Sequence, residues 1–377
     1  MKKKTILWIS LLAIAAIGIY FVWNAQKKNI IQDKEVVKVG AVLPLTGEMA
    51  SYGVQLKKGM DLAIELNNSD SNNTKIEVIY EDDKGDAKSA VSAYRKLVDQ
   101  DNVQIIIGGM FSSSTFAMTP LAEKDRKVLL SPTASAIELT EAGDYFFRIY
   151  PSDIYDGIFL ANFAIKKIKA KRVAIIYEQI ASITAISNKF KEVFETEGGA
   201  VVFISAYSSD MKDFRSILRN LISKKPDLVF MPGNIKTMSS FLIQAKQLNF
   251  KTNFLSISTF YDNKILDLTK EAADGVMFST PMFDLNDTSQ VIQDFAKNYI
   301  NKYGVKADIL GGYGFDVINI TLRALRNGNI SDSIKKNLYG ISNFQGVTGK
   351  TSFDQNGDVD KELKIMIVKG GKFVSLY

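Results

Sequence analysis

Residues 36–43 read VVKVGAVL, and this nearly continuous apolar run decides the fold class. Only Lys38 interrupts it, so the run is typical of a strand with both faces buried in a parallel sheet. The helical pattern that follows places Leu56, Met60 and Ala63 on one face. A buried strand followed by an amphipathic helix is the repeating unit of an α/β fold.

The same alternation continues along the rest of the chain. Further strands are predicted at 75–81, 103–108, 126–130 and 145–149, and a second series follows at 172–177, 201–205, 227–231, 254–257 and 275–279. Helical stripes separate most of these runs. Two successive series of strands and helices predict two doubly wound α/β lobes.

The beginning of the chain carries a membrane signal. Three lysines precede residues 5–23, which hold no charge and would span roughly 28 Å as a helix, close to the thickness of a bilayer core. We expect residues 1–28 to be a signal anchor and 29–35 a linker, with the rest of the chain outside the cytoplasm. A cleaved signal peptide is the alternative, although cutting after Ala25 would put bulky Trp23 where a small residue is needed.

The composition excludes several kinds of chemistry. The chain has no histidine and no cysteine, which rules out Ser-His-Asp and Cys-His catalysis, disulfides, a lipoprotein anchor and thiolate zinc sites. Outside residues 1–28 the basic and acidic residues nearly balance, so no electrostatic argument favours nucleic acid. The DQNGD segment at 354–358 starts like a calcium loop, but Ile365 stands where the last ligand should be. We expect a hairpin turn there, no metal and no cofactor.

Small hydroxyl residues follow two neighbouring strands. GGMFSSST occupies 108–115, and SPTASAIELT occupies 131–140. Ligands of open parallel sheets bind beyond the carboxyl ends of the strands, and helix N-termini attract anions. Ser112, Thr133, the Ala134 backbone and Ser135 are therefore candidates to hold a carboxylate. Simple capping of helix N-termini is the alternative, since serine and threonine are preferred there.

Several segments, in this order, resemble the leucine/isoleucine/valine-binding family of ABC-importer solute-binding proteins. VKVGAVLPLTGEMASYG is similar to the family's opening strand and first ligand loop, and YEDDKGDAKSAVSAYRKLV to its second strand and helix. IIIGGMFSSSTFAMTPLAE and LLSPTASAIELT are similar to its main ligand loops, and FDQNGD to its late hairpin. The resemblance covers about residues 36–368.

The resemblance implies an α/β fold of two doubly wound parallel-sheet lobes joined by a three-crossover hinge. Lobe I would comprise 36–150 plus 281–360, and lobe II 151–280 plus 361–377. The solute would lie in the cleft between the lobes, and hinge closure would enclose it.

The function implied is capture of a small solute, an amino acid or a related carboxylate, and its delivery to an ABC permease in the membrane. We expect a monomer that catalyses no reaction. One alternative is a ligand-sensing subunit that presents its closed state to a membrane receptor, and another is an extracytoplasmic enzyme.

The resemblance also assigns site residues in the first lobe. Ser112 matches the serine that binds the ligand's carboxylate. Thr133 matches a position that acts through its backbone, and Ser135 one that acts through backbone and hydroxyl. Tyr52 matches an aromatic residue that lines the pocket.

The resemblance places the ligand-binding positions of the second lobe at Ser182, Asn234 and Ser258, but the residues there depart from the family pattern. Ser182 stands where a Tyr-Gly pair is usual, and Asn234 where a tyrosine is frequent. Ser258 stands where a glutamate often holds the ligand's ammonium, although a slip of a few residues would bring in Asp262. The carboxylate half of an amino-acid site is therefore kept, while the ammonium half is altered or missing. We expect a solute that carries a carboxylate or a similar acceptor-rich head but is not a simple branched-chain amino acid, because a buried ammonium needs a partner.

Overall fold

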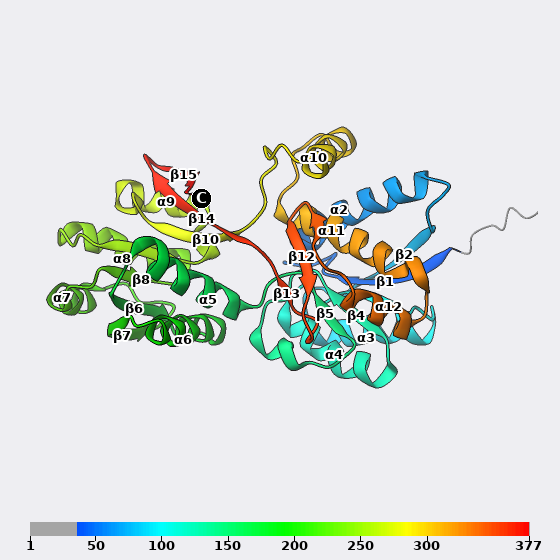
Figure 1. The fold of residues 1–377 in the computed structure, drawn as a ribbon, viewed down its shortest axis with the longest axis horizontal. Coiled ribbons are helices and arrows are strands. Elements are labelled where there is room, and N and C mark those ends of the chain that lie inside the picture. Colours follow the sequence, from blue (N-terminus) through cyan, green and yellow to red (C-terminus); the bar gives the residue numbers. More distant parts are fainter. Residues whose placement is uncertain (1–35, 377) are drawn as a thin grey trace, which may run out of the picture.

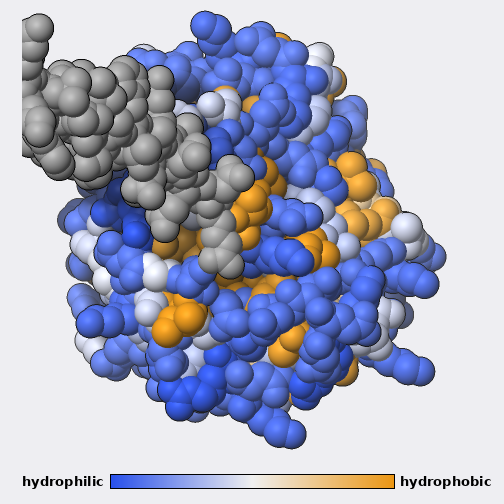
Figure 2. All heavy atoms as spheres, turned by 90° about the vertical axis from the view of Figure 1, so that its right-hand side faces the viewer, coloured by the Kyte–Doolittle hydropathy of each residue, from blue (hydrophilic) through white to orange (hydrophobic). Residues whose placement is uncertain are grey.

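The computed structural model describes residues 36–376, which form two lobes that lie side by side (Figure 1). The predicted anchor, 1–28, and linker, 29–35, lie outside the described residues. Within 36–376, every helix is too short or too polar to cross a membrane. On the face of lobe I seen in Figure 2, the surface is mostly hydrophilic and its apolar residues form small separate patches, as is usual for a face in contact with water.

Lobe I is built on a five-stranded parallel sheet in the order β2-β1-β3-β4-β5. Its strands are β1 (Val37–Leu43), β2 (Ile76–Asp82), β3 (Ile105–Gly108), β4 (Val128–Ser131) and β5 (Phe146–Arg148). One face packs against α2 (Ala50–Ser69), α11 (Ile309–Ala324) and α12 (Ser331–Tyr339), and the other against α3 (Ala87–Asp99) and α4 (Ser112–Asp125). A further helix, α10 (Gln290–Tyr303), packs on α2.

Lobe II is built on a seven-stranded sheet in the order β15-β14-β10-β9-β8-β6-β7. Its strands are β6 (Arg172–Glu178), β7 (Ala200–Tyr207), β8 (Leu228–Phe230), β9 (Asn253–Ser256), β10 (Met277–Pro281), β14 (Leu363–Lys369) and β15 (Lys372–Ser375). One face packs against α5 (Asp153–Phe163) and α6 (Ala181–Thr196), and the other against α7 (Arg215–Lys224), α8 (Ile235–Gln247) and α9 (Asn263–Thr269).

The expectation of wholly parallel sheets is wrong at one edge of lobe II. Strands β6 to β10 are parallel, but β14 runs antiparallel to β10, and β15 runs antiparallel to β14. Gly370 and Gly371 both have positive φ angles in the tight turn between β14 and β15, where glycine is tolerated without strain. A tight hairpin connects antiparallel strands, so the C-terminal strand can return beside its neighbour without a crossover helix.

The described chain passes between the two large sheets three times: between β5 and β6, after β10, and before β14. Before the last passage it forms a small antiparallel sheet from β11 (Phe344–Gly346), β12 (Gly349–Phe353) and β13 (Val359–Asp360). The DQNGD segment forms the turn between β12 and β13, and the Asp354 carboxylate accepts hydrogen bonds from the Asn356 and Asp358 backbone N–H groups. The predicted hairpin turn is confirmed.

Candidate functional site

A cavity of about 490 Å³ lies between the lobes, at the ends of strands of both sheets. Lobe I contributes Tyr52, Phe111, Thr133 and Ser135, and lobe II contributes Ser182, Ile183, Ile186, Ile257, Ser258 and Tyr261. An adjoining cavity of about 370 Å³ shares Ser135, Asp153 and Ser182 with it. A hollow of about 430 Å³ also exists on lobe I alone, but movement of the lobes cannot enclose a solute there. The interlobe cavity is therefore the candidate site.

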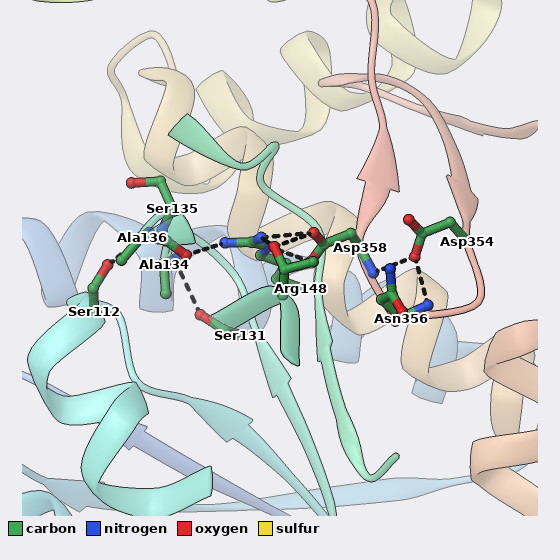
Figure 3. Close-up of polar contacts among 10 residues, drawn as sticks. Ser112, Ser131, Ala134, Ser135, Ala136, Arg148, Asp354, Asn356 and Asp358 are labelled. Atoms are coloured by element: carbon green, nitrogen blue, oxygen red, sulfur yellow. Dashed lines mark hydrogen bonds and ion pairs between the residues drawn. The ribbon is translucent and has the colours of Figure 1, made fainter. Parts of the chain in front are cut away.

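Ser112 is the first residue of α4 and lines the adjoining cavity. Its Oγ accepts hydrogen bonds from the backbone N–H groups of Ser135, at 3.3 Å, and Ala136, at 3.2 Å (Figure 3). It does not cap the helix, because Phe111 occupies the N-cap position without a side-chain bond. With its oxygen accepting two donors, the Ser112 hydroxyl keeps its own proton to donate to an anion.

The loop after β4 contributes two residues to the cavity wall, and a third residue of this loop is buried. Thr133 and Ser135 line the cavity, and the Thr133 hydroxyl donates to the Met110 carbonyl at 2.7 Å. Ala134 is buried, and its N–H donates to the Ser131 hydroxyl at 3.1 Å. The Ala134 N–H therefore already has a partner inside the loop, and Ala134 is not among the residues that line either cavity. A role of the Ala134 backbone in ligand binding stays a prediction.

Tyr52 lies at the rim of the cavity. Its ring packs edge-on against Phe111, with the ring centroids 6.2 Å apart, and about half of its surface is exposed. The Tyr52 ring is thus placed to cover a solute from the side of lobe I.

The second-lobe candidates do not all reach the cavity. Ser182 and Ser258 line it, but Asn234 does not. Asn234 caps α8 by accepting from the Thr237 N–H, while its own side-chain and backbone N–H groups donate to Glu178. Its hydrogen-bonding groups are thus used by the fold, which corrects the expectation that Asn234 binds ligand. Asp262 likewise caps α9, where it accepts from the Lys264 N–H.

Two carboxylates that sequence reasoning missed also line the cavity. Asp153 and Asp156 lie in the first turn of α5, just after the first passage between the lobes. Burial raises the pKa of both carboxyls, that of Asp156 to about 6. Serine followed by aspartate is common at the start of any helix, so the sequence of α5 suggests an ordinary helix cap. The only signal for a functional role is the position of these residues next to the predicted passage between the lobes.

The lining is acidic overall. Among the described residues around the two adjoining cavities, the charged ones are Glu138, Asp153 and Asp156, and none is a lysine or arginine. The site can thus offer hydroxyls and a helix N-terminus to an anion and carboxylates to a cation.

Comparison with known proteins agrees with this geometry. Residues 36–372 match the model of a family described as periplasmic binding proteins. The chain belongs to this family. It is similar to the Leu/Ile/Val-binding protein of Escherichia coli K12, with 26% identity over 333 residues that cover 86% of this chain and 88% of the relative. A leucine-, isoleucine-, valine-, threonine- and alanine-binding protein of Pseudomonas aeruginosa is 24% identical over 86% of this chain and 87% of its own length.

Solved structures show the same fold. A putative branched-chain amino acid ABC transporter protein from Rhodospirillum rubrum superposes with a TM-score of 0.83 at 24% identity, over 90% of this chain and 100% of that one. A branched-chain amino acid transporter substrate-binding protein from Streptococcus pneumoniae, solved with isoleucine, gives 0.71 at 25% identity over 90% and 100%. The resemblance seen in the sequence is confirmed, as is the expectation that this periplasmic binding protein is not an enzyme.

In this periplasmic binding protein a buried ion pair supports the loop after β4. Arg148, at the end of β5, is fully buried, and its Nε and Nη2 donate to the two carboxylate oxygens of Asp358 at 2.6 and 2.7 Å (Figure 3). Its Nη1 donates to the Ala136 carbonyl at 2.8 Å. The loop whose backbone binds Ser112 is therefore fixed to the β12–β13 turn through one guanidinium, in the bidentate geometry that arginine favours.

Proposed function

We propose that this protein is the solute receptor of an ABC importer and that it captures an amino acid or a related small carboxylate between its lobes. The observation that carries the proposal is the Ser112–Ser135 contact at the N-terminus of α4, beside cavities lined by both lobes. Relatives named for binding leucine, isoleucine and valine, at similar length, support the solute class.

The anion end of the solute would lie at the start of α4. The first amides of a helix lack partners within the helix, and the helix dipole favours negative charge there. The Ser112 hydroxyl proton adds a donor beside them. A carboxylate placed there would receive charge-assisted hydrogen bonds without needing a lysine or arginine.

Closure of the lobes would couple binding to transport. Because residues of both lobes line one cavity, a solute that contacts both has a higher affinity for the closed arrangement and shifts the population toward it. The permease would then recognise the closed, loaded receptor. We further propose that the protein acts as a monomer outside the cytoplasm, held at the membrane by residues 1–28.

The sensor alternative lacks comparable support. The similar proteins are named for solute binding or for ABC transport, and none of the reported ones is named as a sensor. Transport therefore stays the proposed role.

Binding of carboxylates to the purified full chain tests the proposal. Thermal shift and calorimetry would compare the twenty amino acids with their methyl esters, which lack the negative charge. We expect at least one amino acid to raise the melting temperature and its ester to fail. If no amino acid or 2-oxo acid binds, or if esters bind equally well, the proposed function is wrong.

A further inference from the structure

The two missed carboxylates share one face of a helix at the hinge. Asp153 and Asp156 are three residues apart in the first turn of α5, a spacing that makes side chains neighbours on a helix surface. Both line the interlobe cavity. Among residues 36–376, no lysine or arginine forms a salt bridge with either of them.

The surroundings of Asp156 do not neutralise it. Its Oδ1 accepts from the Ser279 hydroxyl at 2.6 Å, and the other titratable groups around it are Asp153, Tyr150 and Tyr313. The buried Lys361 lies with its ammonium over the Tyr313 ring, 4.8 Å from the ring centroid, and donates to the Thr348 hydroxyl. A half-buried carboxylate without a cation is costly, which is why its pKa is raised.

Two unpartnered hydroxyls lie in the same cavity wall. Ser152 and Tyr313 line the cavity, are 7% and 0% exposed, and their hydroxyls have no hydrogen-bond partner among the described residues. Burial raises the pKa of the Tyr313 hydroxyl, and the nearby Tyr150, Asp316 and Asp156 raise it further. Buried hydroxyls are nearly always satisfied, so these two indicate a ligand that would bond to them.

The acidic pair also adjoins the carboxylate end of the site. The Asp153 N–H donates to the Ser135 carbonyl at 2.8 Å, and the Ser135 hydroxyl bonds the Asp153 carboxylate. Ser135 in turn bonds Ser112 through its backbone N–H. Anion and cation positions are therefore neighbours, as the two charged groups on a single α-carbon require.

We propose that Asp153 and Asp156 form a cation subsite at the hinge and that the solute is an α-amino acid whose ammonium binds between them. This inference rests on the proposed function for the carboxylate end of the same solute. Ser152 and Tyr313 supply further oxygen acceptors around the ammonium. The side chain of the solute then faces the apolar residues Ile183, Ile186 and Ile257. Specificity for the ammonium thus comes from α5, in place of the lobe II loop at Ser258.

Matched ligands and matched variants test the subsite. The probes are the twenty L-amino acids, each with its 2-oxo acid, which lacks the ammonium, titrated into the full chain in detergent. We expect the amino acid to bind at least tenfold more tightly than its 2-oxo acid. Asp156→Asn should weaken amino-acid binding about 10- to 100-fold and leave or improve 2-oxo-acid binding, since a hydrogen bond to a charged group is lost. Asp262→Asn, a carboxylate outside the cavity, is the control and should change neither.

Each outcome bears on one claim. If the 2-oxo acid binds wild type as tightly as the amino acid, or if Asp156→Asn and Asp153→Asn both leave amino-acid affinity unchanged, the subsite is refuted while the proposed function stands. If neither probe of any pair binds wild type, the proposed function itself fails. Should an aspartate variant not fold, Tyr313→Phe removes only the unpartnered hydroxyl, and unchanged affinity for the amino acid would count against the subsite.

Discussion

The substitution Asp156→Asn should raise the free energy of unfolding of the unliganded protein at pH 7. Burial raises the pKa of the Asp156 carboxyl from 3.8 to about 6, while the Ser279 hydroxyl, 2.6 Å away, opposes the shift only in part. In the unfolded chain the carboxyl titrates near its ordinary value. Folding at neutral pH therefore buries a charge that no cation neutralises.

The size of the effect follows from the shift. One pKa unit corresponds to about 1.36 kcal/mol, so roughly two units make ionised Asp156 cost the folded state about 3 kcal/mol at pH 7. Because the folded-state pKa is raised, the cost is absent below about pH 4 and grows as the pH rises to about 6. Asparagine cannot ionise and still accepts from Ser279. We expect the variant to gain about 1–3 kcal/mol at pH 7, since water at this half-buried group reduces the full value.

Urea denaturation of the full chain in detergent between pH 4 and pH 8 measures this gain. Far-UV circular dichroism is the signal, because both tryptophans, Trp8 and Trp23, lie in the predicted anchor. The difference between wild type and variant reports the cost of the ionised Asp156, which includes its repulsion with Asp153. Asp210→Asn, at an exposed loop carboxylate with a lowered pKa, should gain nothing. Equal stability at pH 7, or a gain that does not shrink toward pH 4, would refute the reasoning.

Three further substitutions test other parts of the structure. Ser112→Ala should weaken amino-acid binding by about 1.5–3 kcal/mol, measured by calorimetry, and leave the unliganded fold intact; unchanged affinity would make Ser112 a loop brace only. Asp358→Asn should lower the free energy of unfolding by about 3–5 kcal/mol, because it removes the negative charge that neutralises the buried Arg148 guanidinium, and a loss below 1 kcal/mol in denaturation would contradict this. Gly314→Ala should destabilise by several kcal/mol or prevent folding, since its Cβ would lie 2.0 Å from the Leu56 carbonyl oxygen; a variant with wild-type melting temperature would show that α2 and α11 can separate.

The alternation of strands and helices is readable from the sequence because buried parallel strands are short apolar runs. Residues 105–108, with the sequence IIIG, are an example, and they form β3. The direction of β14 is not readable in this way. Its sequence, LKIMIVK, is compatible with a parallel or an antiparallel buried strand. Its antiparallel pairing with β10 depends on where the chain re-enters lobe II after passing through lobe I, which the local sequence does not show.

The first-lobe half of the candidate site is predictable because its residues follow directly from strand ends. Thr133 and Ser135 come after β4 and line the cavity. Asp156 is not predictable locally, since acids in the first turn of any helix complement its dipole, and nothing near it in the sequence says which side of α5 faces the cavity. The prediction for Asn234 fails for a related reason. A polar residue between a strand and a helix can either cap the helix or bind a ligand, and the sequence does not distinguish the two roles; Asn234 caps α8.

The pairing of β10 with β14 constrains how the two lobes can move. Pro281 pairs with Leu363 and Thr280 with Lys364, so two of the three passages leave lobe II as adjacent strand ends in one sheet. They form a single ribbon, and neither can shift without the other. The remaining passage, at 149–152, is the second attachment. The ribbon and this passage together define one hinge axis. We expect the lobes to open and close by rotation about that axis and to resist rotation about any other.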